Sequence, residues 1–120
     1  MAAMSKEGHA REFRLRRGAD FRRVYERKCS VADPVLILYA CDNELGHVRL
    51  GLSVSRKIGD AVTRNRWKRL VREVFRKLRG ELSGGFDFVV LPRPGAKPQF
   101  TTVAASLPNL VRRGVRKLSR

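Results

Sequence analysis

The sequence has few cysteines, no long hydrophobic run and few acidic residues, and each of these absences excludes a class of protein. Its two cysteines, Cys29 and Cys41, are too few for a disulfide framework, so we expect buried or half-buried free thiols. No apolar run reaches the length of a membrane span, and the polar N-terminus lacks the apolar region of a signal peptide. These features predict a cytoplasmic protein that does not enter a membrane.

The residues that catalysis by the protein itself would need are also missing. The histidines, His9 and His47, stand alone, whereas acid–base nucleases need two positioned proton-transfer groups. No Cys and His spacing suits zinc, and the acidic residues are scattered rather than clustered as a Mg²⁺ site requires. We therefore expect no catalytic residue and no metal ion bound by the protein.

What the chain does have is positive charge. Its 120 residues include 27 Lys and Arg against 11 Asp and Glu, which gives a net charge of +16. Self-repulsion of this size destabilises a compact chain, so we expect a polyanion such as nucleic acid as the partner. The hydrophobic content of 42% is typical of a globular domain. We expect a disordered arm over residues 1–12 and one folded domain over residues 13–118.

The hydrophobic pattern predicts the elements of the first half. Phe21, Val24 and Tyr25 recur at helical spacing in a helix over residues 18–27. Residues 30–41 are apolar on both faces and predict a strand, with Asp33-Pro34 near its start. Residues 42–46 supply the turn of a hairpin to the next strand.

The strand over residues 48–55 alternates in polarity. One face is apolar, and the other face carries Arg49, Gly51, Ser53 and Ser55. The second face is polar and almost bare of bulk, which leaves room for a ligand to lie against it.

Three more elements complete the chain. Residues 61–79 form the strongest helix, whose apolar stripe includes Trp67, and we assign this tryptophan to the core. Residues 86–91 form the last strand, and residues 99–118 form a helix that Pro108 should kink or split in two. The order predicts an α+β domain in which a sheet packs against helices.

Positive charge is concentrated between Gly51 and Glu73. Its cations are Arg56, Lys57, Arg64, Arg66, Lys68, Arg69 and Arg72. A face that is merely solvated would mix acidic residues among them, but the helix contains none before Glu73. Backbone amides at the helix N-terminus also favour anions. We therefore predict that this segment binds nucleic acid.

The same segment carries a specific motif. The run Arg64-Asn65-Arg66-x-Lys68-Arg69-x-x-Arg72, preceded by Gly51-Leu52-Ser53-Val54-Ser55 and Lys57-Ile58-Gly59-x-Ala61-Val62, resembles the signature of the bacterial ribonuclease P protein family. The resemblance covers residues 13–113 and includes Leu15, Asp20, Phe21, Tyr25, Tyr39, Asp87, Arg93 and Leu107-x-x-Leu110.

The resemblance implies a single domain of α-β-β-β-α-β-α order. It also implies a subunit that assists a catalytic RNA in removing the 5′ leader from precursor tRNA. The protein alone would not be catalytic, and Mg²⁺ would act through the RNA subunit. In the family, the basic helix contacts the catalytic RNA, and a central cleft between the first helix and the exposed sheet face holds the single-stranded leader.

Candidate site residues follow from this division. The leader would contact Phe21, Tyr25, Tyr39 and Arg49, and the catalytic RNA would contact Arg56, Lys57, Arg64, Asn65, Arg66, Lys68, Arg69, Arg72 and Arg93. The aromatic rings would stack on or pack against unpaired nucleotides. For Phe21, a place in the hydrophobic core and a place in the cleft fit the sequence equally well. For Tyr25 and Tyr39 the cleft is favoured, because a hydroxyl group needs water or a polar partner.

Two other classes of protein remain open. A ribosomal protein of the same fold accounts for the charge, but it gives no reason for the spacing of the cations between Arg64 and Arg72. A protein-only nuclease needs the positioned acids and histidines that this chain lacks.

Overall fold

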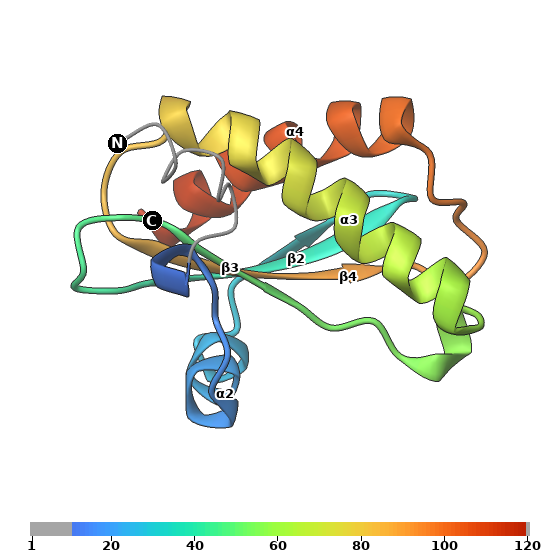
Figure 1. Ribbon diagram of the computed structural model, residues 1–120. Coiled ribbons are helices and arrows are strands. Elements are labelled where there is room, and N and C mark those ends of the chain that lie inside the picture. The colour runs from blue at the N-terminus through green and yellow to red at the C-terminus, as the bar shows by residue number, and fades with distance from the viewer. Residues whose placement is uncertain (1–10, 120) are drawn as a thin grey trace.

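The computed structural model describes residues 11–119 and places a sheet between helices (Figure 1). Its elements are the 3₁₀ turn η1 (Arg11–Phe13), α2 (Gly18–Glu26), β1 (Ser30–Ala32), β2 (Leu36–Asp42), β3 (Arg49–Leu52), the 3₁₀ turn η2 (Arg56–Ile58), α3 (Ala61–Leu78), the 3₁₀ turn η3 (Arg79–Glu81), β4 (Phe86–Pro92) and α4 (Phe100–Leu118). The α+β class and the α-β-β-β-α-β-α order are confirmed. Most of the expected arm, including His9, lies outside the described residues.

The four strands form one sheet in the order β1-β2-β4-β3. β2 pairs with β1 and β4 in antiparallel fashion, whereas β3 and β4 run parallel. The helix α3 connects β3 to β4. Because these two strands run parallel, their C-terminal ends lie at the same end of the sheet.

The larger core lies between the sheet and the helices α3 and α4, which cross the same face (Figure 1). Leu38 of β2 and Phe88 of β4 point into it and are fully buried. Trp67 of α3 is also fully buried, so its assignment to the core is confirmed. Cys29 and Cys41 are buried free thiols, as expected.

The other face of the sheet is covered by α2. Val24 of this helix packs against Cys41 and Val89 of the strands. Because α2 has only nine residues, it covers part of the face, and Tyr39 and Leu91 remain half-buried. The cleft that the sequence predicts would lie against this partly open face.

The expected single strand over residues 30–41 is wrong. The segment folds back on itself, and β1 and β2 pair with each other, with Val31 opposite Leu38. The carboxylate of Asp33 stabilises the turn, since it accepts hydrogen bonds from the backbone amides of Val35 at 2.8 Å and Leu36 at 2.9 Å. Pro34 occupies the turn itself, where the absence of an amide hydrogen costs no sheet hydrogen bond.

The expected hairpin around residues 42–46 is also wrong. Asn43 does form a local turn, in which its side-chain oxygen accepts from the amide of Leu45 at 2.9 Å. The strands on either side do not pair, because β4 lies between β2 and β3. Apart from Asp87, the sequence of β4 is apolar on both faces, and the strand is largely buried at the centre of the sheet. Burial of these residues outweighs the local turn signal.

Pro108 does not split the last helix. α4 continues through it from Phe100 to Leu118. A proline inside a helix removes one backbone hydrogen bond, but the neighbouring Leu107, Leu110 and Val111 are fully buried, and their packing holds the helix together. No helix within residues 11–119 is long and apolar enough to cross a membrane.

Candidate nucleic-acid interface

Phe21 of α2 lies directly over Gly51 of β3. A Cβ atom at Gly51 would stand 2.8 Å from Cζ of Phe21 and 3.0 Å from Cβ of Leu15. The ring therefore needs a residue without a side chain beneath it. The bare strand face expected at residues 49–55 is thus covered at Gly51. β3 itself ends at Leu52, and beyond it Ser53 is half-buried and Ser55 is exposed.

Tyr25 and Tyr39 meet at the open part of this face. Their rings pack edge to face, with centroids 5.0 Å apart and an interplanar angle of 89°. Both side chains are half-buried and pack beside Leu91 at the margin of the smaller core. The structure thus brings together two of the predicted leader-binding residues, from α2 and β2, at the edge of the region that α2 leaves open.

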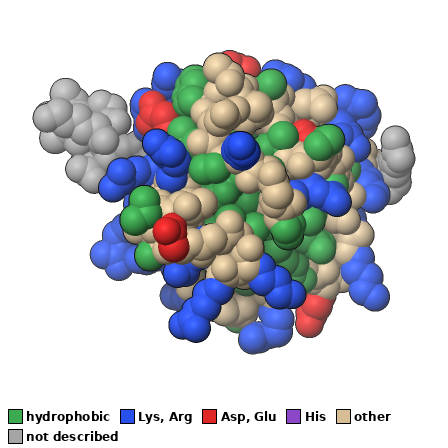
Figure 2. Space-filling model, turned by 90° about the vertical axis from the view of Figure 1, so that its right-hand side faces the viewer, with side chains coloured by type: hydrophobic (Ala, Val, Ile, Leu, Met, Phe, Trp, Pro, Cys, Tyr) green, Lys and Arg blue, Asp and Glu red, His purple; other side chains and the backbone are tan. Residues whose placement is uncertain are grey.

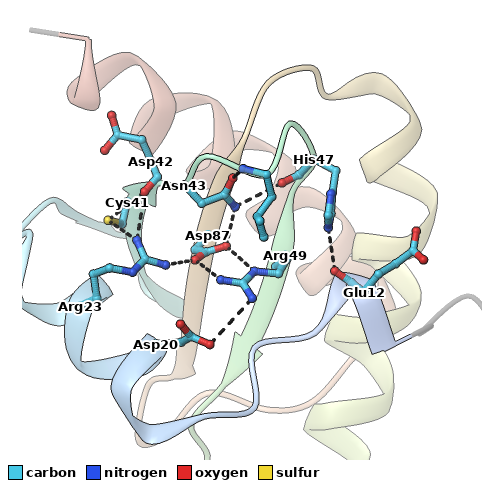
Figure 3. A network of polar contacts seen from close by, with 10 residues as sticks. Glu12, Asp20, Arg23, Cys41, Asp42, Asn43, His47, Arg49 and Asp87 are labelled. Atoms are coloured by element: carbon cyan, nitrogen blue, oxygen red, sulfur yellow. Dashed lines mark hydrogen bonds and ion pairs between the residues drawn. The ribbon is translucent and has the colours of Figure 1, made fainter.

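Arg49 is held by a buried carboxylate. Its Nε donates to Oδ1 of Asp87 at 2.9 Å, and its Nη2 donates to Oδ2 at 2.8 Å (Figure 3). Its Nη1 lies 3.8 Å from a carboxylate oxygen of Asp20. The hydrogen bond to Asp87 raises the pKa of Arg49. The guanidinium is therefore paired on several sides before any ligand approaches.

Asp87 is the centre of this network. Its carboxylate is fully buried and also accepts hydrogen bonds from Arg23 of α2 and from Asn43, the latter at 2.7 Å (Figure 3). Burial alone would raise the pKa of Asp87, but the hydrogen bonds from Arg49 and Asn43 and the nearby positive charge outweigh it and lower the pKa. Asp87 thereby ties α2, β3 and the segment after β2 to β4.

Sequence reasoning missed this network, although a signal exists. Asp87 is the only charged residue of the strand sequence FDFVVLP. A carboxylate inside an apolar central strand is stable only with charged or hydrogen-bonding partners. Arg23 and Arg49 are those partners, and both could have been searched for on the elements that face the strand.

The predicted RNA-binding cations occupy two places. Arg56 and Lys57, in η2 after β3, and Arg93, directly after β4, are all exposed. Because β3 and β4 are parallel, these three lie at the strand ends opposite to Arg49. Figure 2 looks onto the end of the molecule at which β4 ends and α3 begins, and it shows a central hydrophobic area bordered mainly by Lys and Arg side chains.

The remaining cations lie on α3, whose first turn is capped by Asp60, which accepts from the amide of Thr63 at 2.9 Å. The exposed side of the helix carries Asn65, Arg66 and Arg69. Arg64 lies closer to the core side and donates to the carbonyl of Gly59 at 3.2 Å. The predicted residues of α3 therefore do not form one face.

Lys68 and Arg72 line a separate small pocket of about 150 Å³ on the flank of α3, together with Arg14 from the segment before α2. The Nε atom of Arg14 is buried there without a hydrogen-bond partner. Burial, and then the nearby charge of Arg14, lower the pKa of Arg72. Like charges gathered in this way favour the binding of an anion.

No group of three or more His, Cys, Asp or Glu residues within residues 11–119 could hold a metal ion. The Nε2 atom of His47 lies 2.8 Å from the backbone oxygen of Glu12, and its ring packs edge to face on Phe13. These contacts give His47 a place in the packing of the N-terminal segment.

Comparisons with known proteins agree on one family. The family model described as Ribonuclease P matches residues 10–115. A relative from Streptococcus pneumoniae (strain Hungary19A-6), named Ribonuclease P protein component, is 39% identical over 87 residues, which cover 72% of this chain and 71% of the relative.

Solved structures of the same family are also similar. The RNase P protein of Staphylococcus aureus has 37% sequence identity and a TM-score of 0.76 and covers 83% of this chain and 93% of its own. The RNase P protein of Thermotoga maritima has 36% identity and a TM-score of 0.74 over 83% of this chain and 96% of its own. Sequence and fold therefore point to the same relatives.

Proposed function

The chain belongs to the ribonuclease P protein family, and from this premise we propose how its surfaces divide the work within the ribonucleoprotein. The protein is a component of ribonuclease P, the tRNA-processing endoribonuclease that contains RNA. In our proposal, the exposed side of α3 binds the catalytic RNA, and the open face beside α2 binds the 5′ leader of precursor tRNA. We also place the protein in the cytoplasm.

The observation that carries the first assignment is the unpaired charge of α3. Within residues 11–119, Arg66 and Arg69 have no carboxylate partner, whereas Arg76, further along the same helix, pairs with Glu73 at 2.7 Å. Cations left without acidic partners are available for phosphates, and neutralised phosphates dominate the affinity of proteins for nucleic acids. Arg14, Lys68 and Arg72 extend this charge along the flank of the helix.

The second assignment is supported by the open sheet face. The edge-to-face pair of Tyr25 and Tyr39 offers aromatic surface to unpaired bases, which stack on such rings. Arg56, Lys57 and Arg93, exposed at the C-terminal ends of β3 and β4, belong in this proposal to the surface that binds the catalytic RNA. Phe21 packs on Gly51 and so helps to hold α2 against the sheet beside the two tyrosines. Arg49 would meet the leader with its guanidinium already bound to Asp87.

Mg²⁺ belongs to the RNA in this proposal. The acidic side chains of residues 11–119 do not gather into a metal-binding cluster, and Asp87, the most deeply buried carboxylate, is surrounded by arginines and an amide. The donor set of the described residues therefore does not fit a divalent cation, and we derive no catalytic step from the protein.

Reconstitution tests the proposal. The purified protein, freed of RNA, should not cleave precursor tRNA, and cleavage at the 5′ leader should appear when a bacterial ribonuclease P RNA and Mg²⁺ are added. Cleavage by the RNA-free protein would show that the active site lies in the protein and would overturn the division of labour proposed here.

A further inference from the structure

The exposed side of α3 carries an aliphatic side chain at one end of its positive charge. Val62, in the first helical turn, is 77% exposed, compared with 52% for Leu45 and 45% for Phe100. Single aliphatic side chains on a protein surface are common and identify nothing by themselves. Val62 is different because it borders a hollow that cationic and amide groups also line.

This hollow has a volume of about 540 Å³ and extends along α3 from Val62 to Leu70. Asn65, Arg66 and Arg69 lie between the two aliphatic ends. Positions three, four, seven and eight residues apart fall on one side of a helix, so the five residues form a continuous stripe. Within residues 11–119, Asn65, Arg66 and Arg69 make no hydrogen bond or ion pair through their side chains.

Phosphate binding explains only part of this stripe. Arg66 and Arg69 suit phosphates, but the methyl groups of Val62 and the neutral amide of Asn65 contribute little to binding a charged group. A nucleotide that is not base-paired offers surfaces for all of them. Its phosphates suit the arginines, its base edge can pair with an amide, and the faces of its base and ribose suit aliphatic groups and guanidinium planes.

We propose that the hollow between Val62 and Leu70 binds an unpaired nucleotide of the partner RNA. Its base or ribose lies against the two aliphatic side chains, the amide of Asn65 faces the base edge, and the arginines hold the flanking phosphates. This inference rests on the proposed function, because it takes the exposed side of α3 as the surface that binds RNA. It adds that α3 prefers a bulge or a loop over a regular duplex, whose bases are stacked and paired.

Dissociation constants of the full chain for a bacterial ribonuclease P RNA, measured at several salt concentrations, provide the first test. Val62→Ala removes two exposed methyl groups and leaves a good helix former, so folding is preserved. We expect binding about fivefold weaker at every salt concentration, with an unchanged salt dependence. Leu45→Ala, which trims another exposed aliphatic side chain, is the matched control and should bind like the wild type.

Arg69→Ala distinguishes the nucleotide site from the wider RNA-binding role of α3. A reduced salt dependence for Arg69→Ala together with wild-type binding by Val62→Ala would overturn the nucleotide site and leave the RNA-binding role of α3 intact. Wild-type binding and salt dependence in both variants would overturn that role as well.

Two short RNA duplexes that differ only by one bulged adenosine test the unpaired state of the nucleotide. Val62→Ala should weaken binding to the bulged duplex and leave binding to the regular duplex unchanged. Equal weakening for both duplexes would place Val62 against the riboses of a paired helix and would overturn the assignment.

Discussion

Arg49 and Asp87 are joined by two hydrogen bonds of 2.9 and 2.8 Å, although they are 38 residues apart in the chain. They sit opposite each other at the start of the parallel pair β3 and β4, where Arg49 faces Asp87 in the register. Because Arg23 of α2 also binds Asp87, the position of the helix that borders the open sheet face depends on one buried carboxylate.

Asp87→Asn should strongly destabilise the fold. The substitution keeps the size of the side chain but leaves Arg23 and Arg49 without their negative partner, and breaking a buried ion pair by removing one member costs about 3–5 kcal/mol. Urea denaturation of both proteins measures this loss. Asp42→Asn is the control, because Asp42 is exposed and its closest ion-pair distance, to Arg27, is 3.8 Å. Equal stabilities for Asp87→Asn and Asp42→Asn would contradict the central role of Asp87.

Acid should remove the same contribution. The pKa of Asp87 is lowered in the folded state, so its stabilising effect is fully present above the unfolded carboxyl pKa, about 3.9, and is lost as the pH falls through the folded pKa. The free energy of unfolding of the wild type should therefore drop below about pH 4. Asp87→Asn should show a smaller drop, with the remainder coming from Asp33 and Asp60, whose pKa values are also lowered. Parallel pH profiles for the two proteins would argue against this linkage.

Gly51→Ala tests the contact between α2 and the sheet. The added Cβ would lie 2.8 Å from the ring of Phe21, and such overpacking costs about 1–3 kcal/mol. Phe21→Leu in the same chain should recover part of the loss, because the smaller side chain leaves room for the methyl group. A double-mutant cycle by denaturation measures the coupling. Additive losses would mean that Phe21 and Gly51 do not share this contact.

The sequence predicted the helices better than the strands. The apolar stripe of α3 and the pattern around Val24 in α2 place residues on one helical side, and both helices were located within a residue or two. Strand pairing depends on partners distant in the chain, which no local pattern contains. Residues 42–46 read as a hairpin turn, yet β4, which comes later, takes the place between the strands.

The candidate site shows the same difference between local patterns and partners that are distant in the chain. The cations of α3 were found because they recur within one helix, and the residues for the leader came from a family resemblance. That resemblance named Asp87 without giving it a partner. The pairing of Asp87 with Arg49 and Arg23 joins three separate elements, so only the folded structure reveals that Arg49 is already bound.

Arg69→Ala should weaken assembly with the catalytic RNA without affecting folding. Arg69 is exposed on α3, on the side opposite the buried Trp67. The loss of one phosphate contact should lower the slope of log affinity against log salt by about 0.7–0.9. Lys97→Ala, in the exposed loop before α4, is the charge-matched control. If both variants lose the same slope, the effect comes from net charge rather than from a contact at α3.

Tyr25→Ala and Tyr39→Ala should weaken the binding of precursor tRNA but not the binding of mature tRNA. The two rings form one edge-to-face pair at the margin of the open sheet face, and a single-stranded leader can reach this surface, whereas a folded tRNA body is too bulky to do so. Each variant, assembled with the catalytic RNA, should therefore lose about 1–3 kcal/mol of binding to precursor tRNA if one base stacks there. Binding of mature tRNA should stay unchanged.

One further variant and one further measurement make this comparison selective for the leader. Tyr39→Phe keeps the ring and removes only the hydroxyl group, so it should bind precursor tRNA almost as the wild type does if stacking supplies the affinity. Assembly of each variant with the catalytic RNA is measured separately, since a loosened α2 would lower it. Equal losses for precursor and mature tRNA would show that Tyr25 and Tyr39 act by packing the smaller core, in which they are already half-buried.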